Sequence, residues 1–286
     1  MTVEDHERRW QGPWYPVLGD RLNLMLGYHG AALLPCGDFQ VDELELTGPP
    51  DTFTLRCLAA YITPAMRTAN SVGYENRTLL EIAESIAGKY GLSVTSAPEV
   101  SDVSFARVTQ KHESDLVFLK RLAREHDYDF TVRGATMVFY SRGALEQMPP
   151  VATLTRSDVE EFEFRNRTHR IYRAAQVAYQ DPMSKALISQ GTVNSSVPSG
   201  DHLKLAVRCE NAQQALIKAQ AALHAQNMLF TEAVIVAPGS IEFATGSNLA
   251  LSNFGEFDGT YLICGASHKL DRKSGYRTQL EMRRVA

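Results

Sequence analysis

The sequence predicts an α+β protein that is mainly β, with two similar antiparallel β units flanking a small α+β domain. Two observations carry this prediction. Three strands separated by glycine-containing turns occur at residues 19–60, and the same pattern returns at residues 246–284. Between these copies, residues 64–146 place apolar side chains at helical spacing. The repeat is one of pattern and not of sequence identity, and it indicates a scaffold built from two related units.

Length and composition are those of an ordinary globular protein. The chain has 286 residues, of which 44% are hydrophobic and 22% charged, enough for two or three small domains. The net charge of −4 argues against nucleic acid or an anionic membrane as the main partner. No apolar run approaches about 18 residues, and the first residues are charged. We therefore expect neither a membrane-spanning helix nor a secretory signal.

The first β unit is expected to be the first part of a domain at residues 1–63, with strands near 21–26, 37–46 and 52–58. The last of these strands alternates, with Phe53, Leu55 and Cys57 on one face. The apolar pattern of its partner strand changes phase between Val41 and Leu44, which predicts a β-bulge.

Residues 64–146 are expected to form the small α+β domain. Thr78 and Glu81 have the spacing of a capping box, and Gly91 stands where the helix should end. Ser114 is the expected N-cap of a second helix, which ends near His126. A hairpin over residues 128–140 completes this domain.

Two further segments follow. Residues 147–210 are expected to form a β-rich connecting region that completes the barrels, with strands near 157–164, 170–179 and 185–190. Residues 191–203 are turn-rich and predict an exposed loop. Residues 211–286 are expected to hold a helix capped by Asn211 and then the C-terminal β unit.

Residues that could carry chemistry are few. His112, Glu113 and Asp115 could form an acid/base or metal cluster, but their place at the start of a helix favours capping and solvation. Carboxylates at 160, 161 and 163 are interleaved with phenylalanines, which is typical of the solvent-exposed face of a strand. The scattered cysteines are expected to be small core residues; they are Cys36, Cys57, Cys209 and Cys264. We therefore predict no enzymatic activity, no cofactor and no metal site.

The aromatic residues near the N-terminus are Trp10, Trp14 and Tyr15. Their rings could stack on a sugar or a base. We favour the alternative that they anchor the terminus against its own domain or a neighbour.

Two stretches carry a resemblance to a known family. They are residues 77–92, which begin Arg-Thr-Leu-Leu-Glu-Ile-Ala, and residues 109–123, Thr-Gln-Lys-His-Glu-Ser-Asp-Leu-Val-Phe-Leu-Lys-Arg-Leu-Ala. Residues 258–263, His268 and residues 274–280 fit as well. Over about residues 18–285 the chain resembles the phage late control protein D family, the baseplate hub proteins of contractile phage tails and tail-like bacteriocins.

The resemblance implies a structural role in a ring. Three copies would form a homotrimer, each contributing two tube-like antiparallel β-barrel domains, and would join a six-fold tail tube to a three-fold spike. The implied partners are the central spike protein, the tail tube or tube-initiator proteins, baseplate wedge proteins and, as a further candidate, the tape measure protein. DNA would only pass through the lumen. The implied location is the tail baseplate of the virion or of a tail-like particle, after synthesis in the host cytoplasm.

The sequence leaves two questions about assembly unanswered. Family members begin with an extra strand before Gly19, so this strand is either remodelled within residues 7–17 or the first barrel closes differently. Edge strands 21–26 and 248–252 are our candidates for pairing between subunits or barrels, through Leu22, Leu24, Leu26, Leu249 and Leu251.

Two other functions are compatible with the sequence. The chain could be a component of the spike complex of a contractile secretion system. It could also be a cell-wall hydrolase or glycan-binding module that uses residues 64–142 and the N-terminal aromatics. A hydrolase would be a monomer with paired carboxylates of raised pKa in a cleft.

Overall fold

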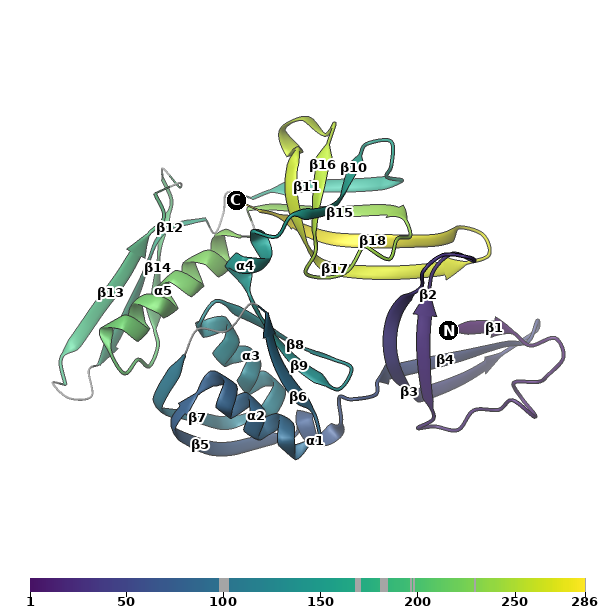
Figure 1. Cartoon of the computed structure of the whole chain (residues 1–286), viewed down its shortest axis with the longest axis horizontal. Helices are drawn as coiled ribbons and strands as arrows, with labels where there is room; N and C mark the ends of the chain where they lie inside the picture. Colours follow the sequence, from purple (N-terminus) through teal and green to yellow (C-terminus); the bar gives the residue numbers. More distant parts are fainter. Residues whose placement is uncertain are drawn as a thin grey trace.

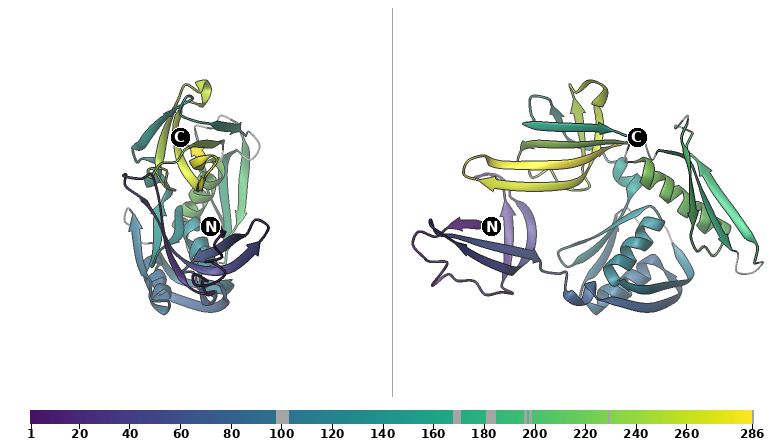
Figure 2. Two further views of the ribbon diagram at one scale, coloured as in Figure 1. Left: turned by 90° about the vertical axis from the view of Figure 1, so that its right-hand side faces the viewer. Right: turned by 180° about the vertical axis from the view of Figure 1, so that it is seen from behind.

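The computed structural model describes residues 1–97, 103–167, 171–180, 185–195, 197, 199–228 and 230–285. The structure is mainly β, and its two largest sheets are curled like parts of barrels (Figure 1). The N-terminal sheet and the C-terminal sheet lie beside each other, the α+β domain lies below the C-terminal sheet, and a third small unit lies at the opposite end from the N-terminal sheet (Figure 1). The molecule is much narrower when it is seen edge-on (Figure 2).

The N-terminal unit is a four-stranded sheet in the order β1-β4-β3-β2. Its strands are β1 (Thr2–Glu4), β2 (Arg21–Leu26), β3 (Leu34–Thr47) and β4 (Thr52–Ala59). The register of β3 on β4 shifts between Val41 and Glu43, which confirms the predicted bulge. The buried core is small and consists of Val41, Phe53 and Leu55.

The extra first strand is present, but not where it was expected. It is β1, which pairs antiparallel with β4 and places Val3 opposite Phe53. No residue of 7–17 belongs to a strand. Of the two alternatives that the sequence left open, a strand remodelled within residues 7–17 is not observed, because this segment forms turns that carry Trp10 back over Phe53.

The α+β domain agrees with the sequence pattern. Its elements are α1 (Pro64–Arg67), β5 (Ala69–Thr78), α2 (Leu79–Lys89), β6 (Ser93–Ala97), β7 (Ser104–Ser114), α3 (Asp115–Glu125), β8 (Tyr128–Arg133), β9 (Thr136–Ser141) and α4 (Arg142–Glu146). The capping box of Thr78 and Glu81 is formed, and the Ser114 hydroxyl accepts from the Val117 amide. The apolar faces of α2 and α3 are buried in one core.

The C-terminal unit is a six-stranded sheet in the order β10-β16-β17-β18-β15-β11. Its elements are β10 (Pro150–Thr155), β11 (Glu161–Asn166), β15 (Thr231–Pro238), β16 (Asn248–Ser252), the 3₁₀ turn η1 (Gly255–Phe257), β17 (Gly259–Asp271) and β18 (Gly275–Arg284). Strand β10 pairs parallel with β16, and all other neighbours are antiparallel. A continuous core runs along one face.

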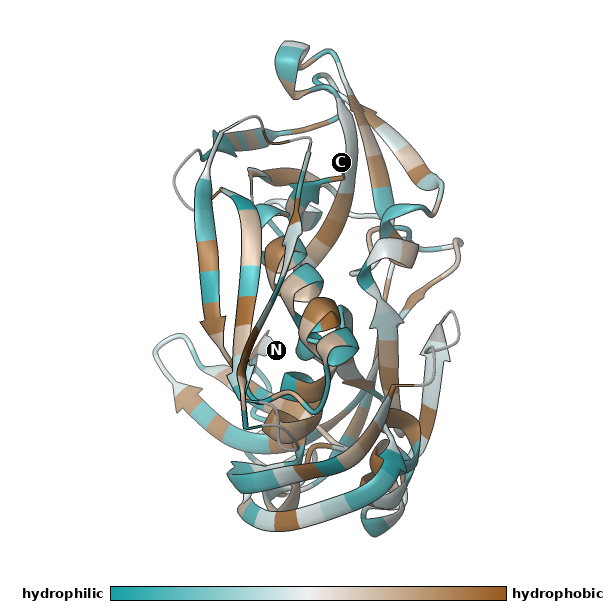
Figure 3. Cartoon of the chain, turned by 90° about the vertical axis from the view of Figure 1, so that its left-hand side faces the viewer, coloured by the Kyte–Doolittle hydropathy of each residue, from teal (hydrophilic) through white to brown (hydrophobic). Residues whose placement is uncertain are grey.

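The third unit places the last helix differently from the expectation. It comprises β12 (Tyr172–Gln180), β13 (Leu187–Val193), β14 (Asp201–Ala206) and α5 (Ala212–Asn227). Ala215 and Ala219 of α5 share a core with Ala175 and Val177 of β12. The expected boundary between residues 210 and 211 was therefore wrong, because α5 packs on β12 and β13 and not on the C-terminal sheet. Hydrophobic and hydrophilic residues alternate along the strands (Figure 3).

The expectation of a loop over all of residues 191–203 was wrong, because the first residues of this segment belong to β13 and its last to β14. Residues 196 and 198, like residue 170 of another predicted strand, lie outside the described residues. The four cysteines are free: Cys209 is buried, Cys36 and Cys57 are half-buried, and Cys264 is exposed, so the prediction of a core position was wrong for Cys264.

The two barrel-like sheets share one register. In the N-terminal sheet, Leu22 faces Phe39 and Leu24 faces Gly37. In the C-terminal sheet the same two places are taken by Leu249 opposite Tyr261 and Leu251 opposite Gly259. Both glycines have positive φ angles, which a residue with a Cβ rarely adopts.

The bulges of the two sheets coincide as well. The register of β3 on β4 shifts around Asp42, three residues after Phe39. The register of β17 on β18 shifts around Cys264, three residues after Tyr261. Strand β1 beside β4 corresponds to β15 beside β18, so the order β1-β4-β3-β2 matches β15-β18-β17-β16. The weak repeat in the sequence is therefore an internal duplication of structure.

We expect Gly239→Ala to destabilise the C-terminal sheet by about 1–3 kcal/mol, because a Cβ at this position would overlap the ring of the buried Tyr276. Urea unfolding or calorimetry would measure the loss. Gly88→Ala is the matched control, since the exposed Gly88 lies in α2 with open space around it and alanine favours a helix. Equal stability of the two variants would contradict the packing argument.

Candidate assembly interface

Strand β2 forms an open edge of the N-terminal sheet. It pairs with β3 on one side, and no strand of the described residues lies on its other side. Leu22 and Leu24 are 36% and 40% exposed, and Leu26 is half-buried. Leu22 and Leu24 point to the same face as Phe39 and Val41, which is the apolar face of the sheet. The edge thus combines unpaired backbone groups with uncovered apolar side chains.

Exposed apolar residues are concentrated in the same unit. More than half of the large hydrophobic residues that are exposed in the described part of the chain belong to its first 60 residues. They are Met1, Trp14, Tyr15, Val17, Leu18, Leu22, Leu24, Met25, Tyr28, Leu33, Leu46 and Leu58. Apolar surface gathered in this way is typical of a protein–protein interface.

Strand β16 is not an edge, so the prediction for residues 248–252 was wrong. Strand β10 pairs with β16 on the side away from β17. Leu249 is fully buried and Leu251 is 3% exposed. The sequence could not show this, because β10 lies about a hundred residues earlier and pairs in parallel, without a hairpin to mark it.

The aromatic residues of the N-terminal segment anchor it to the sheet, as favoured from the sequence. The ring of Trp10 stacks on Phe53 with centroids 6.0 Å apart, and Tyr15 meets Phe53 edge-on at 6.1 Å. The buried Asp5 carboxylate accepts a hydrogen bond from the Trp10 amide at 3.1 Å. Trp14 packs edge-on against Trp10 and is still 52% exposed.

The cluster considered as a catalytic or metal site is divided among separate structural roles. Asp115 is fully buried and accepts hydrogen bonds from Gln110 Nε2 and the Tyr90 hydroxyl, both at 2.8 Å. Glu113 pairs with Arg121 at 2.6 Å. Within the described residues, no three side chains of the His, Cys, Asp and Glu types are placed to hold a metal ion.

The charge of Asp115 is maintained by its partners. Burial raises the pKa of this carboxyl, but the hydrogen bonds from Gln110 and Tyr90 and the nearby Lys89 outweigh burial, so the pKa is lowered overall. Burial and the hydrogen bond to Asp115 raise the pKa of Tyr90 to about 12. This carboxylate is a buried anchor for α3, and it lacks the raised pKa of a general acid.

The carboxylates of the β11 segment are surface groups, as expected. Glu161 and Glu163 lie on the exposed face of β11, and Glu163 pairs with Arg165. Glu160 pairs with Arg277 at 2.9 Å.

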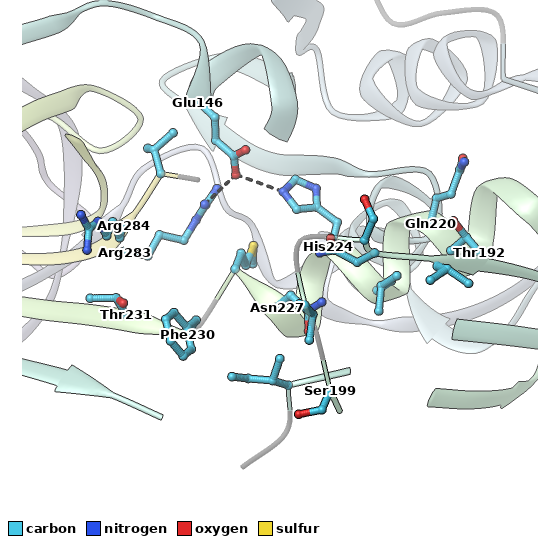
Figure 4. Close-up of a pocket in the computed structure, with 18 residues that line it drawn as sticks. Glu146, Thr192, Ser199, Gln220, His224, Asn227, Phe230, Thr231, Arg283 and Arg284 are labelled. Carbon is cyan, nitrogen blue, oxygen red and sulfur yellow. Dashed lines mark hydrogen bonds and ion pairs between the residues drawn. The ribbon is translucent and has the colours of Figure 1, made fainter. Parts of the chain in front are cut away.

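An ionic cluster joins the α+β domain, the α5 unit and the C-terminal sheet (Figure 4). His224 of α5 contacts Asp127 through Nδ1 at 2.9 Å and Glu146 through Nε2 at 3.1 Å. Arg283 of β18 contacts the same oxygen of Glu146 at 2.6 Å. The partners of His224 are 97 and 78 residues away along the chain, so no local sequence pattern indicates this cluster.

The cluster is charged at neutral pH. Hydrogen bonds to Asp127 and then to Glu146 raise the pKa of His224 to about 9. Burial opposes ionisation of Glu146, but the hydrogen bond with His224 and the charge of Arg283 outweigh it and lower the pKa of Glu146. Four groups of alternating charge therefore connect the three units: Asp127, His224, Glu146 and Arg283.

A cavity of about 940 Å³ lies beside this cluster, between α5, β13 and β18 (Figure 4). The two arginines at its wall already have partners: Arg283 binds Glu146, and Arg284 Nη2 donates to the Asp258 carbonyl at 2.6 Å. Among the described residues, both arginines that line the cavity thus have a partner within the chain.

The described residues contain no helix long and apolar enough to cross a membrane.

The fold and the open sheet edge define a class of protein: a scaffold built from two related curled sheets. The profile of the phage tail baseplate hub (GPD) family matches residues 41–274, and the chain belongs to this family. It is 33% identical over 153 residues to a probable baseplate hub protein of Escherichia phage 186, a match that covers 52% of this chain and 39% of that protein.

Solved structures show the same fold. The tail protein of Neisseria meningitidis MC58 is similar with a TM-score of 0.70 and 14% identity, over 88% of this chain and 80% of that one. A component of the Escherichia coli type VI secretion system is similar with a TM-score of 0.59 and 12% identity, over 92% of this chain and 64% of that one. At these identities the similarity concerns the fold alone.

We expect His224→Gln to reduce the free energy of unfolding by about 2 kcal/mol at pH 6, because it removes the cation between two carboxylates. The folded pKa of His224, about 9, lies above the unfolded value near 6.5. Its contribution is therefore complete below about pH 6.5 and is lost as the pH rises through 9.

Urea unfolding of the wild type and of this variant between pH 6 and pH 10 would measure the effect. His6→Gln is the matched control, since the side chain of His6 is 69% exposed. A loss of stability that is the same at every pH would contradict the role of the charged imidazole.

Proposed function

We propose that this chain is a structural, non-enzymatic hub of a contractile phage tail baseplate or of a tail-like particle. Three copies would form a ring that joins the six-fold tail tube to the three-fold spike. The observation that carries the proposal is the duplication of one β unit within a chain of the baseplate hub family. The chain matches about two fifths of the length of its curated relative, so the partners proposed below go beyond that match.

The duplicated unit suits a protein that lies between a six-fold and a three-fold structure. Three chains that each carry two sheets of the same register would present six related units around one axis. A six-fold neighbour could bind all six units in similar ways. A three-fold neighbour could bind three units of one kind, because the two kinds differ in strand number.

The open edge of β2 is the proposed contact between subunits. Leu22, Leu24 and Leu26 would lie at this contact, where pairing with another chain would satisfy the free backbone groups. Leu249 and Leu251 are not part of this proposal, because β10 already covers them.

The proposed partners follow from the place in the tail. They are a central spike protein, tail tube or tube-initiator proteins, baseplate wedge proteins and the tape measure protein, with DNA only in transit. The net charge of −4 supports free passage of DNA, since phosphate binding relies on lysine and arginine. Assembly in the host cytoplasm and a final place in the tail baseplate complete the proposal.

The two other functions have less support. Similarity to the type VI secretion component concerns the fold at 12% identity, whereas the family match is to phage baseplate hubs. Of the residues considered for a hydrolase, Asp115 and Glu113 are engaged in buried or half-buried contacts that fix α3.

Light scattering after size-exclusion chromatography should give the mass of three chains for the protein alone, or of three chains plus the spike once the cognate spike is added. A single-chain mass in the presence of the spike would reject the hub proposal.

Leu24→Asp should weaken trimer formation at least tenfold, because it places a charge on the apolar face at the open edge. Sedimentation over a range of concentrations would measure the change. Leu270→Asp is the matched control, since Leu270 is 60% exposed near the hairpin turn of β17 and β18. Equal trimer formation by the two variants would reject β2 as the contact.

A further inference from the structure

We propose that β2 of one copy pairs in parallel with β11 of a second copy, so that the N-terminal sheet of one chain continues into the C-terminal sheet of the next. This inference rests on the proposed ring and names the strand that completes the open edge. The two sheets of one chain meet near the hairpin of β17 and β18, through Tyr28 beside Tyr276 and Glu4 beside Arg272, and no strand of the C-terminal sheet pairs with β2 in the described residues. Strand β2 therefore stays free within its own chain.

The C-terminal unit shows what the N-terminal unit lacks. Leu249 and Leu251 of β16 are buried because β10 lies beside them, with Leu154 in register with Leu251. Leu22 and Leu24 hold the same register positions in the N-terminal sheet and are exposed. The missing neighbour of β2 is thus one strand with apolar residues on the closed face.

The internal duplication indicates which sheet edge of a neighbouring copy lies beside β2 in the ring. In a ring of related units that all face the same way, the β2 side of one unit meets the opposite side of the next. That opposite side is the β1 side of an N-terminal unit and the β15 side of a C-terminal unit. Strand β11 is the outermost strand beyond β15, and its other edge is free in the described residues.

The strand directions then fix the pairing as parallel. Antiparallel steps lead from β16 to β17, β18, β15 and β11, so β11 runs in the same direction as β16. Since β2 corresponds to β16, β2 and the neighbouring β11 run the same way in the ring. The pair β10 and β16 already shows this arrangement within the chain.

The side chains of the two strands are complementary. Phe162 of β11 is 40% exposed on its core face, and Leu22 and Leu24 are exposed on the apolar face of β2. On the other face, β11 presents the exposed Glu161 and Glu163, and β2 presents Arg21. Pairing would join apolar to apolar and acid to base.

The same contact can repeat around a closed ring. Each copy gives one β2 and one β11, which are different surfaces, so the interface is heterologous and a ring forms when the rotation closes. Two open edges per copy, both with exposed apolar residues, would be covered in this way.

Disulfide trapping in the full chain tests the proposal. Asn23 and Glu163 are central in their strands and lie on the polar faces, so Asn23→Cys combined with Glu163→Cys should cross-link neighbouring copies after mild oxidation. Asn23→Cys with Glu161→Cys covers the adjacent register. We expect covalent trimers on a non-reducing gel and in the intact mass, from samples whose mass before oxidation is three chains.

The matched control is Asn23→Cys with Thr153→Cys, which places the second cysteine on the exposed face of β10. The single variants report any background from the four native free cysteines. Three-chain particles that cross-link only with Thr153→Cys, or with none of the partner positions, overturn the pairing with β11 and leave the hub proposal intact. A single-chain mass with the spike present overturns both.

Discussion

Backbone hydrogen bonding at the ends of the sheets is the constraint on which this structure depends. A curled sheet that does not close on itself keeps two edges with unpaired amides and carbonyls. The C-terminal sheet adds β10 and β11 outside the four strands that it shares with the N-terminal sheet. The N-terminal sheet has no such additions, and its leucines remain exposed at β2. This difference between two otherwise matching units is the reason that β2 is the proposed contact between subunits.

Local patterns in the sequence were enough for elements whose partners are close along the chain. The capping box at Thr78, the N-cap at Ser114 and the bulge near Val41 follow from short-range chemistry, and all three are present. Elements with distant partners could not be placed in this way. Strand β10 covers β16, and α5 packs on β12, because of tertiary packing that no local spacing encodes.

The sequence predicted one part of the candidate interface correctly and another part incorrectly. Leu22 and Leu24 alternate with polar residues in a short strand, which favours an edge, and β2 is one. Leu249 and Leu251 also stand at every second position of a short strand, yet these residues are buried. Similar strands therefore have opposite exposure, because the neighbour of one is supplied within the chain. The ionic cluster of His224 was beyond sequence reasoning for the same reason, since it joins three separate units.

The shared bulge has a geometric consequence. A bulge bends its strand and increases the local twist, so its position sets where a sheet curves. Asp42 and Cys264 occupy the same place relative to Phe39 and Tyr261. Both sheets therefore bend at equivalent positions along their strands. In the proposed ring of three chains, a channel lined by alternating copies of the two sheets would be round, and displacing either bulge by one residue would make its outline three-cornered.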